Sequence, residues 1–272
     1  MSEYTAKRAR FTPLATLAPE PRLTLQDVPE VDTVTLTTPL ADPSLINTLP
    51  FLTTLRVDSG FLDMFLVDEP FVNALAENTT LTSLDLSRSD LSEVGGVGAL
   101  KTNSSLTILN LSGNVLRDVE GVAIADLLKT NSSLTTLNLA HNELGEDAGV
   151  AIADALERNT TLTTLDLGIN DLGEVGGAAV AGALERNTTL TSLNLAHNDL
   201  GDVGGAAIAR ALETNTTLVE LNVNNNGISQ PILNEIAGKL ADRPPPYTGP
   251  RVKVAVPAAL RANVQFWGGP GL

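Results

Sequence analysis

The feature of this sequence that most restricts its fold is an internal repeat. Residues 159–186 are followed at once by residues 187–214, and the two blocks match at most positions when they are aligned. Six leucines open such units: Leu81, Leu106, Leu134, Leu162, Leu190 and Leu218. The first interval is 25 residues and each later one is 28. A fixed period of about 28 residues indicates a rod of stacked units, because a single small unit cannot bury its own apolar face.

Each unit divides into a strand half and a helix half. Residues 162–167 alternate leucine with threonine or aspartate, which is typical of a strand with one buried face. Residues 174–186 place apolar side chains at steps of three and four, which predicts a helix with one buried stripe. The residues of this stripe are Val175, Ala179, Val180, Ala183 and Leu184.

Small and charged residues mark the ends of the predicted helices. Gly176 and Gly177 predict a close approach of the helix to the strand layer. Asn187 follows the helix, at a position that favours left-handed backbone. Acidic residues at helix starts and basic residues at helix ends suit the helix dipole. They are Glu146, Asp147, Glu174 and Asp202 at the starts, and Lys129, Arg158 and Arg186 at the ends.

The pattern L-x-x-L-x-L-x-x-N-x-L, present in residues 134–144, resembles the motif of leucine-rich repeats. The 28-residue length and the second half GGAAIARALE resemble the ribonuclease-inhibitor-like subclass. This resemblance implies that the asparagine points inward and bonds loop backbone that burial would otherwise leave unpaired. It predicts an α/β fold, a right-handed solenoid of about eight units bent into a horseshoe arc. A parallel sheet lines its concave face and helices cover its convex face.

Three regions are predicted along the chain. Residues 31–243 form the solenoid, with regular units over 81–243 and with helices expected at 69–77 and 228–242. Residues 1–30 are an N-terminal extension or cap. Residues 244–272 are a tail rich in proline, glycine and aromatic side chains, in which the alternating residues 251–256 are a candidate edge strand.

Composition restricts partners and compartment. The net charge is −15, and residues 81–243 hold 21 acidic and 9 basic residues. Such a surface disfavours nucleic acid and anionic membranes and is compatible with a basic protein partner. No apolar run is long enough to span a membrane, and the N-terminus lacks the apolar core of a signal peptide. We expect a cytoplasmic protein, with nuclear location and delivery into a host cell left open.

Six Asn-x-Ser/Thr triplets follow the repeat and are expected to be turn residues rather than glycosylation acceptors. They begin at Asn78, Asn103, Asn131, Asn159, Asn187 and Asn215.

Polar side chains line the predicted inner face. The position between the second and third leucines of each unit holds a short acid or amide: Asp85, Asn110, Asn138, Asp166, Asn194 and Asn222. Two residues after the third leucine come Arg88, Gly113, His141, Ile169, His197 and Asn225. Except for Gly113 and Ile169, these are candidate partner-binding residues. The alternative is a solvated ladder in which neighbouring polar side chains pair with one another.

No pattern predicts catalysis or a cofactor. His141 and His197 lie two strands apart, about 10 Å, which is too far for a shared zinc. The glycine pairs lack the Gly-Lys-Ser/Thr ending of a phosphate loop. Cysteine is absent, which excludes thiolate chemistry. The sequence therefore predicts a protein that is not an enzyme and needs no metal or cofactor.

The tail supplies a second set of candidate partner-binding residues. Residues 73–246 contain no aromatic side chain, although protein interfaces are rich in them. The proline-tyrosine run resembles the PPxY ligand of WW domains, which a pre-extended proline segment suits. The candidates in the tail are Pro244, Pro245, Pro246, Tyr247, Phe266 and Trp267.

These observations predict a non-enzymatic scaffold for protein–protein interaction that uses the concave face, the aromatic ends, or both. One alternative is a structural component of a larger assembly whose tails dock into neighbours. Another is a regulator of a small GTPase, since Ran GTPase-activating proteins resemble this subclass. Arg56 and Arg88 are the only arginines on the early inner strands or the turns beside them.

Overall fold

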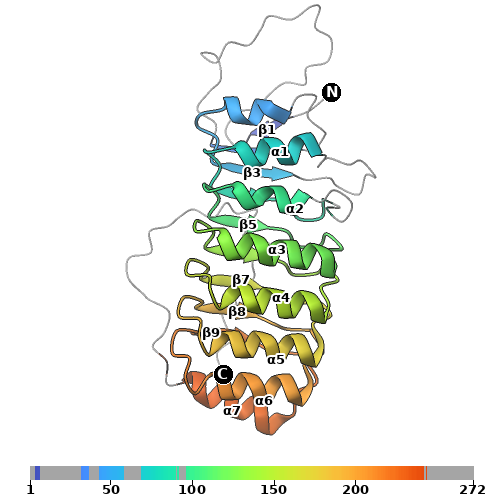
Figure 1. Ribbon diagram of the computed structural model, residues 1–272, viewed down its shortest axis with the longest axis vertical. Helices are drawn as coiled ribbons and strands as arrows, with labels where there is room; N and C mark the ends of the chain where they lie inside the picture. The colour runs from blue at the N-terminus through green and yellow to red at the C-terminus, as the bar shows by residue number, and fades with distance from the viewer. Residues whose placement is uncertain are drawn as a thin grey trace, which may run out of the picture.

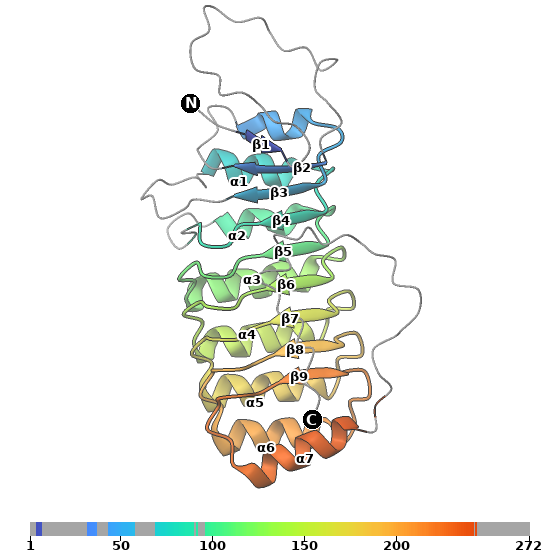
Figure 2. The same cartoon turned by 180° about the vertical axis from the view of Figure 1, so that it is seen from behind.

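A computed structural model describes residues 4–6 (backbone only), 32–36, 43–57, 69–89, 91, 96–241 and 243 of the chain. These residues form a stack of units, each a strand followed by a loop and a helix (Figure 1). Figure 2 shows the strands on one side of the stack, with the helices behind them. The PPPY motif, Phe266, Trp267, the stretch 251–256 and most of residues 1–30 lie outside the described residues.

One open sheet runs the length of the stack, with its strands in chain order. The first pair, β1 (Tyr4–Ala6) and β2 (Thr33–Leu36), is antiparallel. From β2 onward, all eight strands are parallel, which confirms the predicted solenoid of about eight units. The others are β3 (Thr54–Val57), β4 (Ser83–Asp85), β5 (Ile108–Asn110), β6 (Thr136–Asn138), β7 (Thr164–Asp166), β8 (Ser192–Asn194) and β9 (Glu220–Asn222).

Helices cover the other face of this sheet. The predictions at 69–77 and 228–242 are confirmed by α1 (Glu69–Glu77) and α7 (Gln230–Ala241). Short 3-10 helices are η1 (Pro43–Thr48) and η3 (Leu100–Thr102). The remaining helices are α2 (Gly96–Ala99), α3 (Asp118–Thr130), α4 (Glu146–Leu156), α5 (Gly173–Leu184) and α6 (Gly201–Ala211). None of the described helices is long and apolar enough to cross a membrane.

Stacked leucines form one continuous core between the sheet and the helices. Leu137, Leu165 and Leu193 are register partners on neighbouring strands, and each is buried. Full burial of a leucine contributes about 1.5–3 kcal/mol. Because each leucine is buried by equivalent residues of the adjoining units, every unit stabilises the next.

The helix glycines also bring neighbouring units together. A Cβ on Gly149 would lie 2.9 Å from the Cα of Gly176 in the next helix. A Cβ on Gly177 would lie 2.6 Å from Leu200 in the following loop. Since Gly176 and Gly177 occupy the inward side of the first turn of α5, Val175 points to solvent. The prediction that Val175 is buried is therefore wrong, because its side chain is 54% exposed.

The charges at the helix starts lie where the dipole favours them, in the first turns of α4, α5 and α6. Lys129 lies in the last turn of α3. Arg158 and Arg186, however, come two residues after the helices end, which corrects their placement. Arg186 instead forms an ion pair with Glu157 of the preceding unit.

Asparagines in the loop after each strand form the first of two buried polar ladders. The Asn170 side chain donates to the carbonyls of Leu139 at 3.1 Å and Leu167 at 3.0 Å. Its Oδ1 accepts from the backbone N–H of Leu144 at 3.1 Å. This is the role that the family resemblance implied. The ladder comprises Asn114, Asn142, Asn170, Asn198 and Asn226.

The six predicted turn asparagines form the second ladder, between each helix and the next strand. The Asn187 side chain donates to the carbonyl of Leu156 at 2.7 Å, one unit back. Its Oδ1 accepts from the backbone of Thr189 and Leu190. The predicted turn role is confirmed, but Asn187 is not among the residues with positive φ. Its side-chain amide instead points toward the preceding unit, where the Leu156 carbonyl accepts from it.

Arg243 ends this second ladder. Asn215 donates to the carbonyls of Leu184 and Asn187, at 2.8 and 3.0 Å. One unit forward from these acceptors stand Leu212 and Asn215, and the Arg243 guanidinium donates to both carbonyls. An arginine thus occupies the register of the next asparagine.

Candidate protein-binding surface

The six short polar residues of the strands form Asx turns. The Oδ1 atom of Asp166 accepts from the backbone N–H of Gly168 at 2.9 Å, two residues further on. The same bond is made at 2.9–3.1 Å by each of the others. These side chains fix the direction in which the chain leaves the strand. The residues are Asp85, Asn110, Asn138, Asp166, Asn194 and Asn222.

Some of these side chains also pair across strands. Asn110 donates to Asp85 at 2.9 Å, and Asn194 donates to Asp166 at 2.8 Å. Asp85 and Asn110 are each only 2% exposed. The structure therefore gives these predicted partner-binding residues a structural role. It also buries the first three of them, Asp85, Asn110 and Asn138.

Burial raises the pKa of Asp166 above its ordinary value. The hydrogen bonds from Gly168 and Asn194 and the nearby His141 act in the opposite direction and offset part of this effect. Asp166 consequently holds its proton more tightly in the folded chain than in the unfolded chain.

At the N-terminal end of the face, Arg56 on β3 reaches toward Asp85 on β4. The Nε atom of Arg56 lies 3.8 Å from the Asp85 carboxylate. The Arg56 side chain is 26% exposed. This pairing holds the guanidinium against the sheet.

The residues two positions after the third leucine share a left-handed backbone. We call them the turn column: Arg88, Gly113, His141, Ile169, His197 and Asn225. Their φ angles lie between 56° and 71°. The N–H of Ile169 donates to the carbonyl of Ala196 in the next unit at 2.7 Å, and its equivalents in Arg88, Gly113, His141 and His197 bond likewise. The parallel ladder therefore continues into the turn, where a positive φ redirects the chain.

The turn column is exposed where the strand positions are not. Arg88, His141, Ile169, His197 and Asn225 all present exposed side chains. His197 and Asn225 form a hydrogen bond of 2.8 Å between Nε2 and Nδ2. No group of three potential metal ligands occurs among the described residues. The column thus presents one distinct side chain from each of five units: a guanidinium, an imidazole, an aliphatic group, a second imidazole and an amide.

Sequence reasoning placed these residues correctly but missed their backbone geometry. Gly113 and Asn225 are residue types that tolerate positive φ, and they were the available signal. A β-branched residue such as Ile169 rarely adopts this region, so the column did not look left-handed from its sequence.

Family patterns described as leucine-rich repeats match residues 79–144, 158–181, 186–209 and 214–237, together about half of the chain. No curated protein matches the sequence.

Solved structures with similar folds include those of the following three proteins. The leiomodin-1 actin-binding site 2 is 25% identical, with a TM-score of 0.49 over 53% of this chain and 85% of that one. A tropomodulin C-terminal domain from Caenorhabditis elegans is 14% identical, with a TM-score of 0.40 over 62% and 89%. An internalin from Listeria monocytogenes is 18% identical, with a TM-score of 0.40 over 79% and 74%.

The ribonuclease-inhibitor-like subclass stays a prediction, since the matched patterns are those of leucine-rich repeats in general. Those matches agree with the eight parallel strands and the asparagine ladder inside the loops. The chain belongs to the leucine-rich repeat family.

Proposed function

We propose that this chain is a non-enzymatic scaffold that binds another protein, and that the turn column is its recognition strip. The observation that carries the proposal is the left-handed backbone of five non-glycine residues whose side chains are exposed. Left-handed backbone costs a residue with a Cβ roughly 1–2 kcal/mol, which glycine would avoid. Side chains kept at such a cost, without being buried in the core, are best explained by contact with a partner.

The dimensions of the column suit a protein partner. Neighbouring strands lie about 4.8 Å apart, so the six positions extend over roughly 24 Å. Ile169 is 41% exposed and lies between His141 and His197 in the column order. An apolar centre flanked by polar groups is the usual arrangement of a binding patch. The net charge of −15 favours a basic partner through long-range attraction.

A crosslinking experiment tests this proposal. A photoactivatable residue at Ile169 of the full chain, expressed in its native cells, should capture a discrete protein. The same residue at Val175 is the matched control, because Val175 is similarly exposed but lies on a helix of the other face.

The binding of the captured protein is then measured with a variant that keeps the backbone conformation. His141→Gly/Ile169→Gly/His197→Gly removes three side chains where glycine is the preferred residue, so the fold should persist. We expect binding to weaken at least tenfold while the free energy of unfolding does not fall. Unchanged binding by the triple variant, or capture only from Val175, would refute the recognition strip.

The two alternatives remain distinguishable. The assembly component depends on the tail, and deletion of residues 244–272 would abolish assembly without changing partner binding by the column. For the GTPase regulator, Arg56 is held against Asp85, which leaves Arg88 as the exposed arginine. That function requires stimulated GTP hydrolysis that disappears in Arg88→Ala. The cytoplasmic location stays a prediction.

A further inference from the structure

The described sheet ends at β9, which pairs with β8 along one edge. In the preceding unit, the N–H groups of Leu195 and His197 donate to the carbonyls of Asn222 and Asn224, at 2.8 and 3.0 Å. The equivalent groups one unit further on are those of Val223 and Asn225, and no described residue accepts from them. An unpaired edge of this kind is a template for one more strand.

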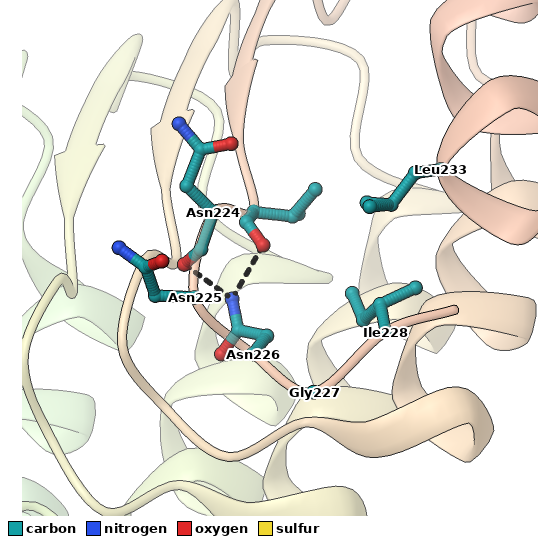
Figure 3. A pocket seen from close by; sticks show the side chains of 7 residues that line it. Asn224, Asn225, Asn226, Gly227, Ile228 and Leu233 are labelled. Atoms are coloured by element: carbon teal, nitrogen blue, oxygen red, sulfur yellow. Dashed lines mark hydrogen bonds between the residues drawn. The ribbon is translucent and has the colours of Figure 1, made fainter. Parts of the chain in front are cut away.

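A hollow lies beside this edge (Figure 3). It has a volume of about 390 Å³ and is lined by residues 223–228 and by Leu233 of α7. Figure 3 shows the side chains of Ile228 and Leu233 on one side of it and the three asparagines on the other. A strand added to β9 would bury apolar side chains against Val223, Ile228 and Leu233.

The spacing of the chain identifies a segment that can fill this position. Seven residues separate α4 from β7 and α5 from β8, and eight separate α6 from β9. Nine residues separate the end of α7 from residue 251. Arg243 lies within this interval and holds the register of the unit asparagine. Residue 251 follows it by eight positions, whereas β8 and β9 begin five positions after Asn187 and Asn215, so the connection is three residues longer than in the regular units.

The sequence of residues 251–256, Arg-Val-Lys-Val-Ala-Val, suits this edge. Val252, Val254 and Val256 share one face of an extended chain, and valine favours strands. Arg251 and Lys253 share the other face, where β9 carries the exposed Glu220. A second copy of the chain fits less well, because it would bring together two molecules of net charge −15.

We infer that residues 251–256, which lie outside the described residues, add to the free edge of β9 as a further parallel strand with their valines over the hollow. The segment thereby closes the sheet against strands of other molecules. This inference is independent of the turn column.

Amide hydrogen exchange of the full-length chain, resolved by residue with NMR, tests the inference. The amides of Val223 and Asn225 should exchange at least a hundredfold more slowly than unprotected amides. In the variant Val252→Asp/Val254→Asp they should become fast, because two carboxylates would be placed without partners against the apolar side chains of Ile228 and Leu233. The matched control Ala258→Asp/Ala262→Asp adds the same charge further along the tail and should leave them slow.

The amides of Leu195 and His197 report whether the solenoid itself stays folded in each variant. Fast exchange of Val223 and Asn225 in the unmodified chain would overturn the inference. So would protection that persists in Val252→Asp/Val254→Asp, and if that protection grew with protein concentration, a second copy would be the occupant.

Discussion

Arg243 lies one full repeat unit after Asn215, and its guanidinium donates to the carbonyl oxygen of Asn215 at 2.5 Å. A second nitrogen of the group also reaches the Asn215 side chain, at 3.4 Å. Burial lowers the pKa of Arg243, although a guanidinium remains charged at every physiological pH. Where the repeat sequence stops, a side chain with five donors satisfies the carbonyls that the next asparagine would have served.

Replacing Arg243 tests its role as the end of the ladder. Arg243→Ala leaves the carbonyls of Leu212 and Asn215 without their donor, and we expect a loss of about 1–3 kcal/mol in the free energy of unfolding. Arg243→Lys keeps the charge but not the fork of donors, so it should restore only part of this loss. Urea denaturation of the full chain measures both. Equal stability of the alanine variant and the unmodified chain would show that water serves these carbonyls as well.

The contact between α4 and α5 predicts opposite effects for two glycine-to-alanine changes. In Gly149→Ala the new Cβ would lie 2.9 Å from the Gly176 backbone, so the helices must move apart, at a cost of about 1–3 kcal/mol. In Gly182→Ala nothing lies within 4 Å of the new Cβ. Alanine favours a helix interior over glycine, so this control should gain about 0.5–1 kcal/mol. Thermal unfolding of the two variants gives the comparison, and a shift of the same sign in both would contradict it.

Ile169 should be a site of backbone strain. Asparagine tolerates the left-handed region better than a β-branched residue, and Asn225 holds the same place two units later. Ile169→Asn should therefore raise the free energy of unfolding by about 0.5–1 kcal/mol. The reverse change, Gly113→Ile, should lower it, since a Cβ there would also lie 3.1 Å from the Arg88 side chain. Chemical denaturation decides the point, and a loss of stability in Ile169→Asn would remove the strain argument.

Asp166 makes stability depend on pH. Its pKa is higher in the folded chain than in the unfolded chain, so ionisation at neutral pH opposes folding. Asp166→Asn keeps an oxygen to accept from Gly168 and Asn194 and removes the charge. We expect higher stability at pH 7, with a gain that shrinks as pH falls through the folded pKa. The gain should vanish below the unfolded value of about 3.9.

The control for this pH dependence is Asp171→Asn, which removes one charge from an exposed loop position of the same unit. It should change stability little and without the same pH profile. Denaturation curves between pH 3 and pH 8 distinguish the two variants, and parallel profiles would mean that net charge alone is responsible.

Periodicity was sufficient to predict the architecture. The leucine spacing placed the strands in register, and the asparagine of the motif was correctly assigned to the loop backbone, as Asn170 shows. These features repeat, so each copy supports the interpretation of the others. The prediction that Val175 is buried is wrong for a physical reason, because the predicted apolar stripe included only residues with hydrophobic side chains. The inward side of that turn is instead occupied by Gly176 and Gly177, which have no side chain to count.

The candidate site was predictable in position but not in geometry. Asp166 and its equivalents were correctly placed on the sheet, but their Asx turns depend on bonds to backbone that composition does not reveal. The left-handed turn at Ile169 contradicts the preference of the residue, so propensity misleads there. Arg243 carried a usable signal, namely its place one full period after Asn215, but the change of residue type concealed it.

The bonds of the two asparagine ladders span no more than one neighbouring unit, as those of Asn170 and Asn187 show. Duplicating residues 187–214 in the gene would therefore create no junction that the protein does not already contain. Removing them would move Asn215 into the place of Asn187, and the carbonyl of Leu184 would then accept from Arg243, which holds the equivalent place one unit further on. The length of such a molecule can change in whole steps over generations, with its two ends carried along unaltered.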